Sequence, residues 1–158
     1  MWVEAFEKTG ALLTTVLNHQ LVSEASNRFR YAVKGQHSQY IDVLYAPDAL
    51  RGFSGRGMVH HVAFATANTE SQLQLMEKIK AFGLHTTGIR NRNYFTSIYF
   101  TEPGGVIFEI ATSGPGFTID EDIAELGMAL KLPAQFEEKR EALNKSLPVF
   151  HYPTQNFT

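Results

Sequence analysis

Cysteine is absent from the 158 residues of this chain, which excludes disulfides, a thiolate nucleophile and any zinc or iron–sulfur site held by cysteine. A metal site here would therefore need histidine and carboxylate ligands. The lack of cysteine is compatible with a reducing cytoplasm, which is the compartment we expect. No run of residues approaches the ~18 consecutive apolar residues of a membrane-spanning helix. The first residues, Met1-Trp2-Val3-Glu4, also lack the basic and then apolar order of a signal peptide.

An excess of one sign of charge is absent as well. Lys and Arg number 14 and Asp and Glu number 16, which gives a net charge of −2. This balance argues against binding to nucleic acid or to an anionic membrane surface, and we expect neither partner. Apolar residues make up 44% and charged residues 19% of the chain. Such a composition is typical of a globular protein with a real core and excludes disorder, collagen-like repeats and a coiled coil.

The first third of the chain predicts a helix followed by two strands. Apolar residues recur at three-to-four spacing from Val3 to Leu17, which is typical of one helix face. Asn18 is expected to end this helix because Asn tolerates a left-handed backbone. Residues 29–33 and 40–45 are rich in β-formers and are separated by a polar loop, so they predict a hairpin.

A second unit repeats this plan more completely. Residues 58–66 predict a strand, 69–82 a helix that Gly83 ends, and 94–101 with 106–112 a second hairpin. We expect the helix to start with a capping-box-like segment at residue 69. Its expected apolar face consists of Leu73, Met76, Ile79 and Phe82.

The predicted organisation has three parts. Residues 46–57 hold three Gly and one Pro and mark an internal boundary. We therefore expect a module without its opening strand at 1–57 and a complete module at 58–116. A C-terminal extension at 117–158 would contain helices at 117–130 and 134–147, with these parts together making one domain.

Alternation along the predicted strands brings three chemically useful side chains together. His61, Tyr99 and Glu109 all fall on the strand faces opposite the bulky residues that should pack on the helix. Ser97 shares the face of Tyr99. Small residues follow His61 on its face and leave room beside it.

Glu109 needs an explanation because burying an unpaired carboxylate costs several kcal/mol. One possibility is that Glu109 meets Arg92 or faces open water. The other is that Glu109 and His61 hold a metal together. One histidine and one carboxylate are two ligands of the facial triad that binds non-haem Fe(II) and leaves positions open for substrate and oxygen.

The motifs at 57–64, 91–100 and 102–112 resemble the glyoxalase or vicinal-oxygen-chelate superfamily. More narrowly, they resemble its branch of ring-cleaving hydroquinone dioxygenases, and the chain matches the C-terminal half of such proteins. The segments at 113–117, 120–121, 126–127 and 132–133 also fit that branch. The resemblance implies an α+β fold of βαβββ modules, whose curled mixed sheet wraps a divalent metal, with C-terminal helices.

The resemblance also implies roles for individual residues. His61 and Glu109 would be metal ligands, with Fe(II) expected and Mn, Zn or Ni as alternatives. Tyr99 would hydrogen-bond the bound oxygen or substrate, and Arg92 would position or polarise the substrate. His60 would support the metal ligand or line the pocket. The substrate would be a small aromatic ring of the hydroquinone or catechol type.

Two departures from the branch affect these expectations. Asn91 stands where the branch usually has Asp, so a local ion pair is lost. The third metal ligand of the family, a histidine on the first strand of a partner module, has no counterpart. It could come from a polypeptide with the front half of the family's sequence, or from His19 or His37 of a second copy. A first module without its opening strand would leave a sheet edge exposed, and such an edge can pair with another chain. We therefore expect an oligomer, and a dimer in particular.

Three functions therefore remain open. The first is an Fe(II)-dependent extradiol-type dioxygenase, and this chain alone could be a complete, an incomplete or an inactive form of it. The second is a metal-dependent glyoxalase or thiol-transfer enzyme. The third is a non-catalytic module with the same fold, either a binding domain or a truncated relic.

Overall fold

The computed structural model describes residues 1–3, 6–33, 35, 39–48 and 55–148. The chain divides into two compact units, Met1–Ile119 and Asp120–Thr158. The strands are β1 (Trp2–Val3), β2 (His19–Ala25), β3 (Arg28–Val33), β4 (Tyr40–Tyr45), β5 (Val62–Thr66), β6 (Arg90–Asn91), β7 (Thr96–Thr101) and β8 (Ile107–Thr112). The α-helices are α1 (Phe6–Thr15), α2 (Thr69–Ala81) and α3 (Arg140–Ser146), and 3₁₀ helices occupy Phe117–Ile119, Ile123–Glu125 and Ala134–Lys139. In the part of the chain that the structure describes, no helix has the length and apolar character needed to cross a membrane.

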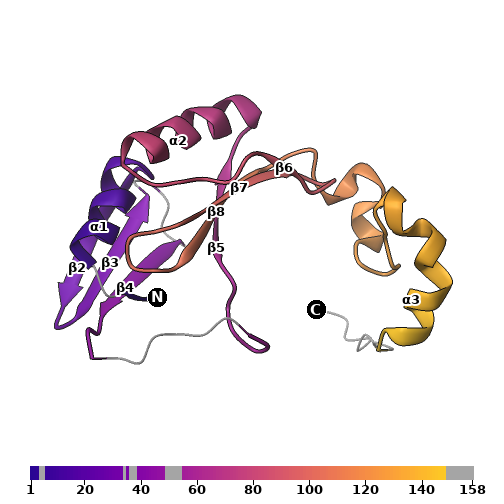
Figure 1. The fold of residues 1–158 in the computed structure, drawn as a ribbon, viewed down its shortest axis with the longest axis horizontal. Coiled ribbons are helices and arrows are strands. Elements are labelled where there is room, and N and C mark those ends of the chain that lie inside the picture. Colours follow the sequence, from indigo (N-terminus) through magenta and orange to yellow (C-terminus); the bar gives the residue numbers. More distant parts are fainter. Residues whose placement is uncertain (4–5, 34, 36–38, 49–54, 149–158) are drawn as a thin grey trace. The chain divides into compact units, whose positions relative to one another are not determined.

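Two four-stranded sheets of the same topology form the first unit. Their strand orders are β1-β4-β3-β2 and β5-β8-β7-β6. In each sheet the opening strand runs parallel to the last strand of its half, and the other pairs are antiparallel. Figure 1 shows α1 beside the first sheet and α2 beside the second. Each half is thus a βαβββ module, which confirms the predicted α+β fold.

The opening strand of the first module corrects one expectation. We expected that module to lack this strand and the first helix to include Val3. Instead, Trp2 and Val3 pair in parallel with Leu44 and Tyr45. Strand β1 therefore exists, but it covers only two of the six residues of β4.

The ends of the predicted elements agree with the structure where local chemistry sets them. Asn18 follows α1 with a φ of 55°, as expected of an Asn that stops a helix. Gly83 follows α2 with a φ of 94°. The hairpins at β3–β4 and β7–β8 also lie where the sequence predicts them.

Two predictions fail in segments with little buried surface: β2 is not predicted, and β5 is predicted too long. Strand β2 has no fully buried side chain, so the apolar alternation that would identify it is weak. Strand β5 begins at Val62 rather than at Met58. Before it, Met58 and Val59 are 57% and 86% exposed, so burial does not hold them in the sheet.

Helix α2 starts as predicted and buries most of its predicted apolar face, since Ile79 is fully buried and Met76 and Phe82 pack against the core. Asn68 caps it, and reciprocal hydrogen bonds with Ser71 form a capping box one residue earlier than expected. Gln72 is fully buried, and its amide nitrogen donates to a carbonyl oxygen of β7 and one of β8 at 2.9 and 2.8 Å. Leu73, expected on the apolar face, is 41% exposed. A polar side chain thus docks this helix on the second sheet.

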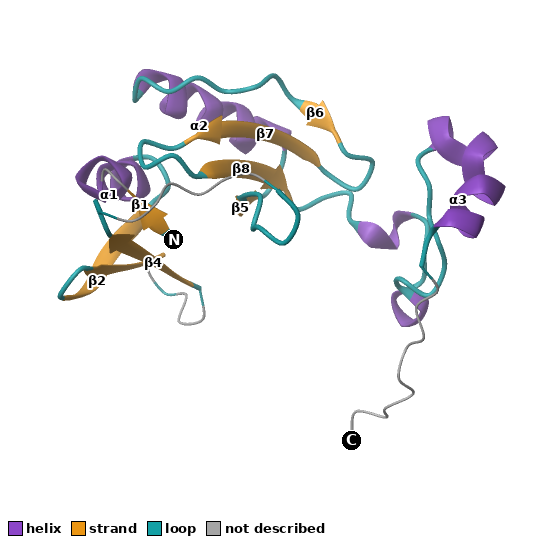
Figure 2. Cartoon of the chain, turned by 60° about the horizontal axis from the view of Figure 1, so that its bottom comes forward, coloured by secondary structure: helices purple, strands orange, loops and turns teal. Residues whose placement is uncertain are grey.

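The main core lies between the helices and the two sheets of the first unit. Phe108 and Ile110 of β8 and Ile98 and Phe100 of β7 are at most 3% exposed. The remaining core residues are Val3, Leu12, Leu13, Val16, Leu17, Tyr31, Val43 and Ile79. Figure 2 shows β7 and β8 side by side with α2 running along them. The opposite faces of β7 and β8 are therefore free to carry polar groups.

The prediction of a helix at 117–130 is wrong, whereas the C-terminal helix α3 is present in the second unit. Only the two short 3₁₀ helices form in that range. Gly127 has a φ of 77°, a left-handed conformation that an α-helix cannot continue through. Ile123 and Met128 are 80% and 60% exposed, so little apolar burial stabilises a longer helix there.

Candidate metal centre

Glu109 lies at the centre of the second sheet, on the face that points away from the core. It pairs with Tyr99 on β7 and with Ala63 on β5, so these three residues form one row across the sheet. Its neighbours Phe108 and Ile110 are fully buried on the core side. The side chain of Glu109 is only 4% exposed. Strand alternation therefore places it as the sequence predicts.

His61 reaches Glu109 from the segment that leads into β5. Its Nε2 lies 2.7 Å from Glu109 Oε2, and the side chain of His61 is 33% exposed. Both alternatives for Glu109 are wrong, because its carboxylate is buried and contacts His61, while Arg92 donates to the Tyr99 hydroxyl.

His60 contacts the far side of the His61 ring. The two Nδ1 atoms are 2.9 Å apart, and the rings are nearly perpendicular, at 85°. One Nδ1 must donate to the other, and this bond holds the His61 ring with its Nε2 toward Glu109. A residue that supports a metal ligand would make such a contact, and this role of His60 stays a prediction.

Tyr99 and Arg92 form the other polar edge of the site. Arg92 Nη2 donates to the Tyr99 hydroxyl at 3.3 Å, and the guanidinium carbon lies 5.4 Å from the Tyr99 ring centre. The Tyr99 ring meets the His61 ring edge to face, with 5.7 Å between centres. Five side chains thus make one continuous cluster: His60, His61, Arg92, Tyr99 and Glu109.

The carboxylate of Glu109 fits a cation. Its Oε1 is buried and has no hydrogen-bond partner among the described residues. An unsatisfied charged oxygen is costly, and a bound cation would remove that cost. Two ligand atoms that each lie ~2.1 Å from one ion, at right angles to each other, are about 3 Å apart, close to the observed 2.7 Å between Nε2 and Oε2.

A complete ligand set is not present in the described part of the chain, where no group of three or more metal-binding side chains occurs. His19, one suggested source of a third ligand, packs its ring against Phe64 at 5.7 Å. Its Nδ1 lies 2.7 Å from the Leu17 carbonyl oxygen, and burial lowers its pKa. His37, the other suggestion, lies outside the described residues. His61 and Glu109 therefore provide two ligands and leave the remaining coordination positions open.

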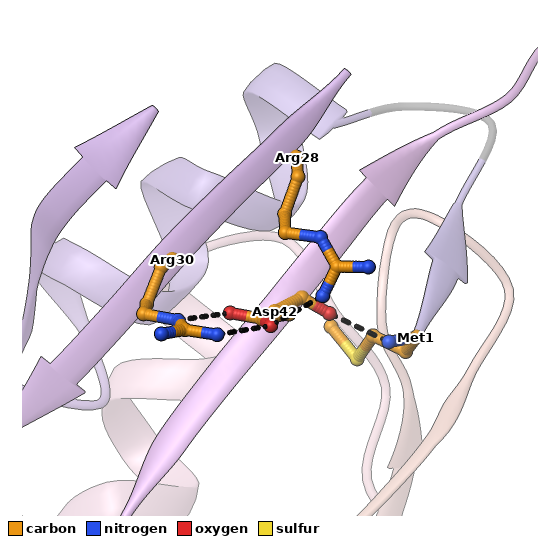
Figure 3. Close-up of polar contacts among 4 residues, drawn as sticks. All are labelled: Met1, Arg28, Arg30 and Asp42. Atoms are coloured by element: carbon orange, nitrogen blue, oxygen red, sulfur yellow. Dashed lines mark hydrogen bonds and ion pairs between the residues drawn. The ribbon is translucent and has the colours of Figure 1, made fainter. Parts of the chain in front are cut away.

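The first sheet has a carboxylate at the equivalent position. Asp42 on β4 pairs with Arg30 on β3, as Glu109 pairs with Tyr99. Arg30 Nε and Nη2 donate to the two oxygens of Asp42 at 2.7 and 2.8 Å, and Arg28 Nη1 donates at 2.7 Å (Figure 3). The Met1 amine donates to the backbone oxygen of Asp42. The Arg30 hydrogen bonds in particular hold the pKa of Asp42 far below its usual range. This carboxylate is already neutralised and has no capacity left for a metal.

Two features of this chain are shared with a known family: the paired βαβββ modules, and a His and a Glu on the sheet face away from the core. Residues 1–110 match the Glyoxalase/Bleomycin resistance protein/Dioxygenase superfamily. The chain belongs to the glyoxalase superfamily. Fosfomycin resistance protein FosX from Listeria monocytogenes shares the superfamily fold with 24% identity and a TM-score of 0.57, over 72% of this chain and 86% of that one.

Within the glyoxalase superfamily, several relatives of this chain are named as dioxygenases. MhqE of Bacillus subtilis (strain 168), provisionally named a ring-cleaving dioxygenase, is 42% identical over 90% of this chain and 46% of its own length. Chlorohydroquinone/hydroquinone 1,2-dioxygenase of Sphingobium indicum is 32% identical over 89% of this chain and 45% of its own length.

A solved dioxygenase structure from Bacillus subtilis, also provisionally named, superimposes with a TM-score of 0.88 and 36% identity over 96% of this chain and 48% of that one. The chain thus spans about half the length of these relatives.

One buried residue on the site face received no role from the sequence. Ser97 is fully buried, and its hydroxyl has no partner among the described residues. Alternation puts it on the face of Tyr99, but a single serine in a strand gives no signal of burial.

Proposed function

We propose that this chain contributes the metal-binding module of an Fe(II)-dependent, extradiol-type dioxygenase that cleaves a hydroquinone- or catechol-like ring. The observation that supports the proposal most is the buried carboxylate of Glu109, with one oxygen 2.7 Å from His61 Nε2 and the other without a partner. The names of the relatives support the reaction type, and the geometry supports the ligand pair.

His61 Nε2 and the Glu109 carboxylate would hold the metal, and His60 would keep the His61 ring oriented. Bound Fe(II) would lower the pKa of a coordinated ring hydroxyl and bring substrate and dioxygen together. The reaction breaks one ring carbon–carbon bond and places both atoms of dioxygen in the product, so no external reductant is needed.

Tyr99 and Arg92 would act on the substrate oxygen. The phenol hydroxyl donates a hydrogen bond, and the guanidinium beside it adds a fixed positive charge that stabilises negative charge developing on that oxygen. Their mutual contact at 3.3 Å keeps both groups in one place. Ala63, in the row of Glu109 and Tyr99, leaves space beside the carboxylate for a flat ring.

A second polypeptide would complete the site. Two protein ligands bind Fe(II) weakly, so we propose that a homodimer partner, or a polypeptide with the front half of the family's sequence, supplies a third ligand. The outer edge of β5 supports this proposal, since no strand among the described residues pairs with it. Light scattering at micromolar concentration tests the dimer, and a monomer would contradict it.

The activity is tested by oxygen uptake. The protein is loaded anaerobically with Fe(II), its iron content is measured, and a hydroquinone is added in oxygenated buffer. We expect uptake that His61→Ala and Glu109→Gln abolish and that the matched surface change Glu77→Gln does not. Iron-loaded, folded protein without uptake in the presence of the front-half polypeptide would refute the proposal.

The same experiment separates the other functions. Stoichiometric metal without oxygen consumption, together with turnover of a methylglyoxal–thiol adduct, would indicate a glyoxalase or thiol-transfer enzyme. Protein that takes up no metal, and whose melting temperature a chelator does not change, would indicate a non-catalytic module.

A further inference from the structure

Ser97 lies in the row next to the candidate ligands. It pairs with Ala111 on β8, which in turn pairs with Ala65 on β5, and Arg90 on β6 continues the row on the other side. Because side chains at positions 97 and 99 point to the same face, the Ser97 hydroxyl stands one row beyond Tyr99 and Glu109. Two alanines complete this row beside Ser97.

The Ser97 hydroxyl is one of two hydroxyls, with that of Thr86, that are buried without a hydrogen-bond partner among the described residues. The residue is 0% exposed, and its oxygen has no hydrogen-bond partner in the described parts of the chain. A buried hydroxyl without a partner destabilises the protein, and alanine would avoid this cost at the same size. The other hydroxyls close to this end of the sheet are engaged, as Thr96 is with Gln72 and Ser113 with Thr66. The unpaired hydroxyl is therefore a candidate to bind a ligand.

The spacing of the rows indicates which ligand atom it would meet. Side chains two residues apart on a strand are about 6.6 Å apart. The two oxygens of a para-dihydroxybenzene lie on opposite sides of the ring, a separation close to one row. Those of an ortho-dihydroxybenzene lie next to each other and would both remain in the row of Glu109.

We infer that Ser97 is a specificity-determining residue that hydrogen-bonds the ring oxygen opposite the one held beside Glu109 and Tyr99. This inference rests on the proposed function, since it assumes that an aromatic diol binds on this face. Ser97 would then favour para over ortho diols, while Tyr99 and Arg92 act on the other oxygen.

Anaerobic calorimetry with Mn(II)-saturated protein tests this assignment. The probes are hydroquinone and 4-methylphenol, which has the same shape but lacks the second oxygen. The variants are Ser97→Ala and the matched control Thr101→Ala, which removes an exposed hydroxyl from the same face of β7 on the other side of Tyr99. We expect Ser97→Ala to weaken hydroquinone binding about 3- to 10-fold, as loss of one neutral hydrogen bond would. Binding of 4-methylphenol should not change, and Thr101→Ala should affect neither ligand.

The melting temperature of the ligand-free variant separates recognition from a structural role. Because the hydroxyl has no partner, Ser97→Ala should leave the melting temperature unchanged or raise it. A clear fall would show that Ser97 stabilises the fold and would overturn the inference.

Glu109→Gln distinguishes a failure of the proposed function from a failure of the role of Ser97. If this change abolishes hydroquinone binding while Ser97→Ala does not alter it, the proposed function stands and the role of Ser97 is refuted. If wild-type protein binds no hydroquinone, or binds it regardless of Glu109, both the proposed function and the role of Ser97 fail.

Discussion

Asp42 and Glu109 occupy the same position in the two modules, yet they have opposite surroundings. Each lies in the middle of the last strand of its module, on the face away from the core, and each precedes a fully buried aliphatic residue, Val43 or Ile110. Across the ladder Asp42 meets an arginine, whereas Glu109 meets a tyrosine. The repeat therefore fixes where a carboxylate lies, and its neighbours decide what it can bind.

The partners of the two carboxylates account for the difference. Two arginines donate three hydrogen bonds to Asp42, so both of its oxygens are satisfied. Among the described residues, Glu109 has one polar side-chain partner, His61, and its Oε1 has none. A carboxylate becomes a candidate metal ligand when it is buried and incompletely neutralised. Of these two carboxylates, Glu109 meets both conditions and Asp42 does not.

The largest expected effect concerns metal affinity. Glu109→Gln should reduce the affinity for Mn(II) or Fe(II) by more than ~100-fold, because changes to residues that merely support a ligand already cost 10–100-fold. Asp42→Asn, the same chemical change at the equivalent position, should have no effect. The measurement is the free Mn(II) signal in electron paramagnetic resonance during titration. Equal losses in both variants would remove the distinction between the modules.

A smaller effect is expected at a third carboxylate, which is buried but fully partnered. Glu102 is 2% exposed and accepts from Thr9 Oγ1 at 2.6 Å and from the Val106 amide at 2.9 Å, so it links α1 to the turn between β7 and β8. Thr9→Val should lower the free energy of unfolding by about 1–3 kcal/mol, because Glu102 Oε2 then loses its donor. Metal affinity should not change.

Thr14→Val is the control for Thr9→Val, since it makes the same change on an exposed part of α1. Surface changes of this kind usually alter stability by less than about 0.5 kcal/mol. If urea unfolding finds the two variants equally stable, the buried contact with Glu102 does not contribute as described.

The smallest effect is the pH dependence of the Asp42 cluster. Because its folded-state pKa is lowered, Asp42 contributes stability above its unfolded pKa of ~3.9, and this contribution is lost as the pH falls toward the folded value. The arginines are 50% and 41% exposed, so water screens the cluster and we expect about 1 kcal/mol at most. Asp42→Asn should therefore destabilise the protein at pH 7 and progressively less below pH ~4. A difference in unfolding free energy that stays constant down to pH 2 would contradict this account.

The sequence predicts the second module better than the first for a physical reason. Strands β7 and β8 bury one face, so their alternation is strong and puts Tyr99 and Glu109 together on the other face. His61 lies in the segment before β5, and its contact with Glu109 does not follow from strand alternation. Strand β2 is almost entirely exposed and leaves no such pattern. The Asp42 cluster depends on the register of the β3–β4 hairpin, which composition does not reveal.

Contacts made by single polar residues also cannot be predicted from the sequence pattern. The burial of Gln72 and Ser97 depends on how the helix and the edge strand pack, and both residues look unremarkable in the sequence. His60 was expected near the site, but its bond to His61 Nδ1 requires both ring orientations. A third metal ligand cannot be predicted from this chain, because the resemblance assigns it to a segment that the sequence does not contain.

The most direct test of a shared cation at His61 and Glu109 is anomalous diffraction at the manganese edge from crystals soaked in Mn(II). We predict one strong peak within about 2.0–2.3 Å of both His61 Nε2 and the Glu109 carboxylate, absent from Glu109→Gln crystals soaked in parallel. A peak elsewhere, with the direct contact between His61 and Glu109 unchanged at saturating Mn(II), would contradict the account.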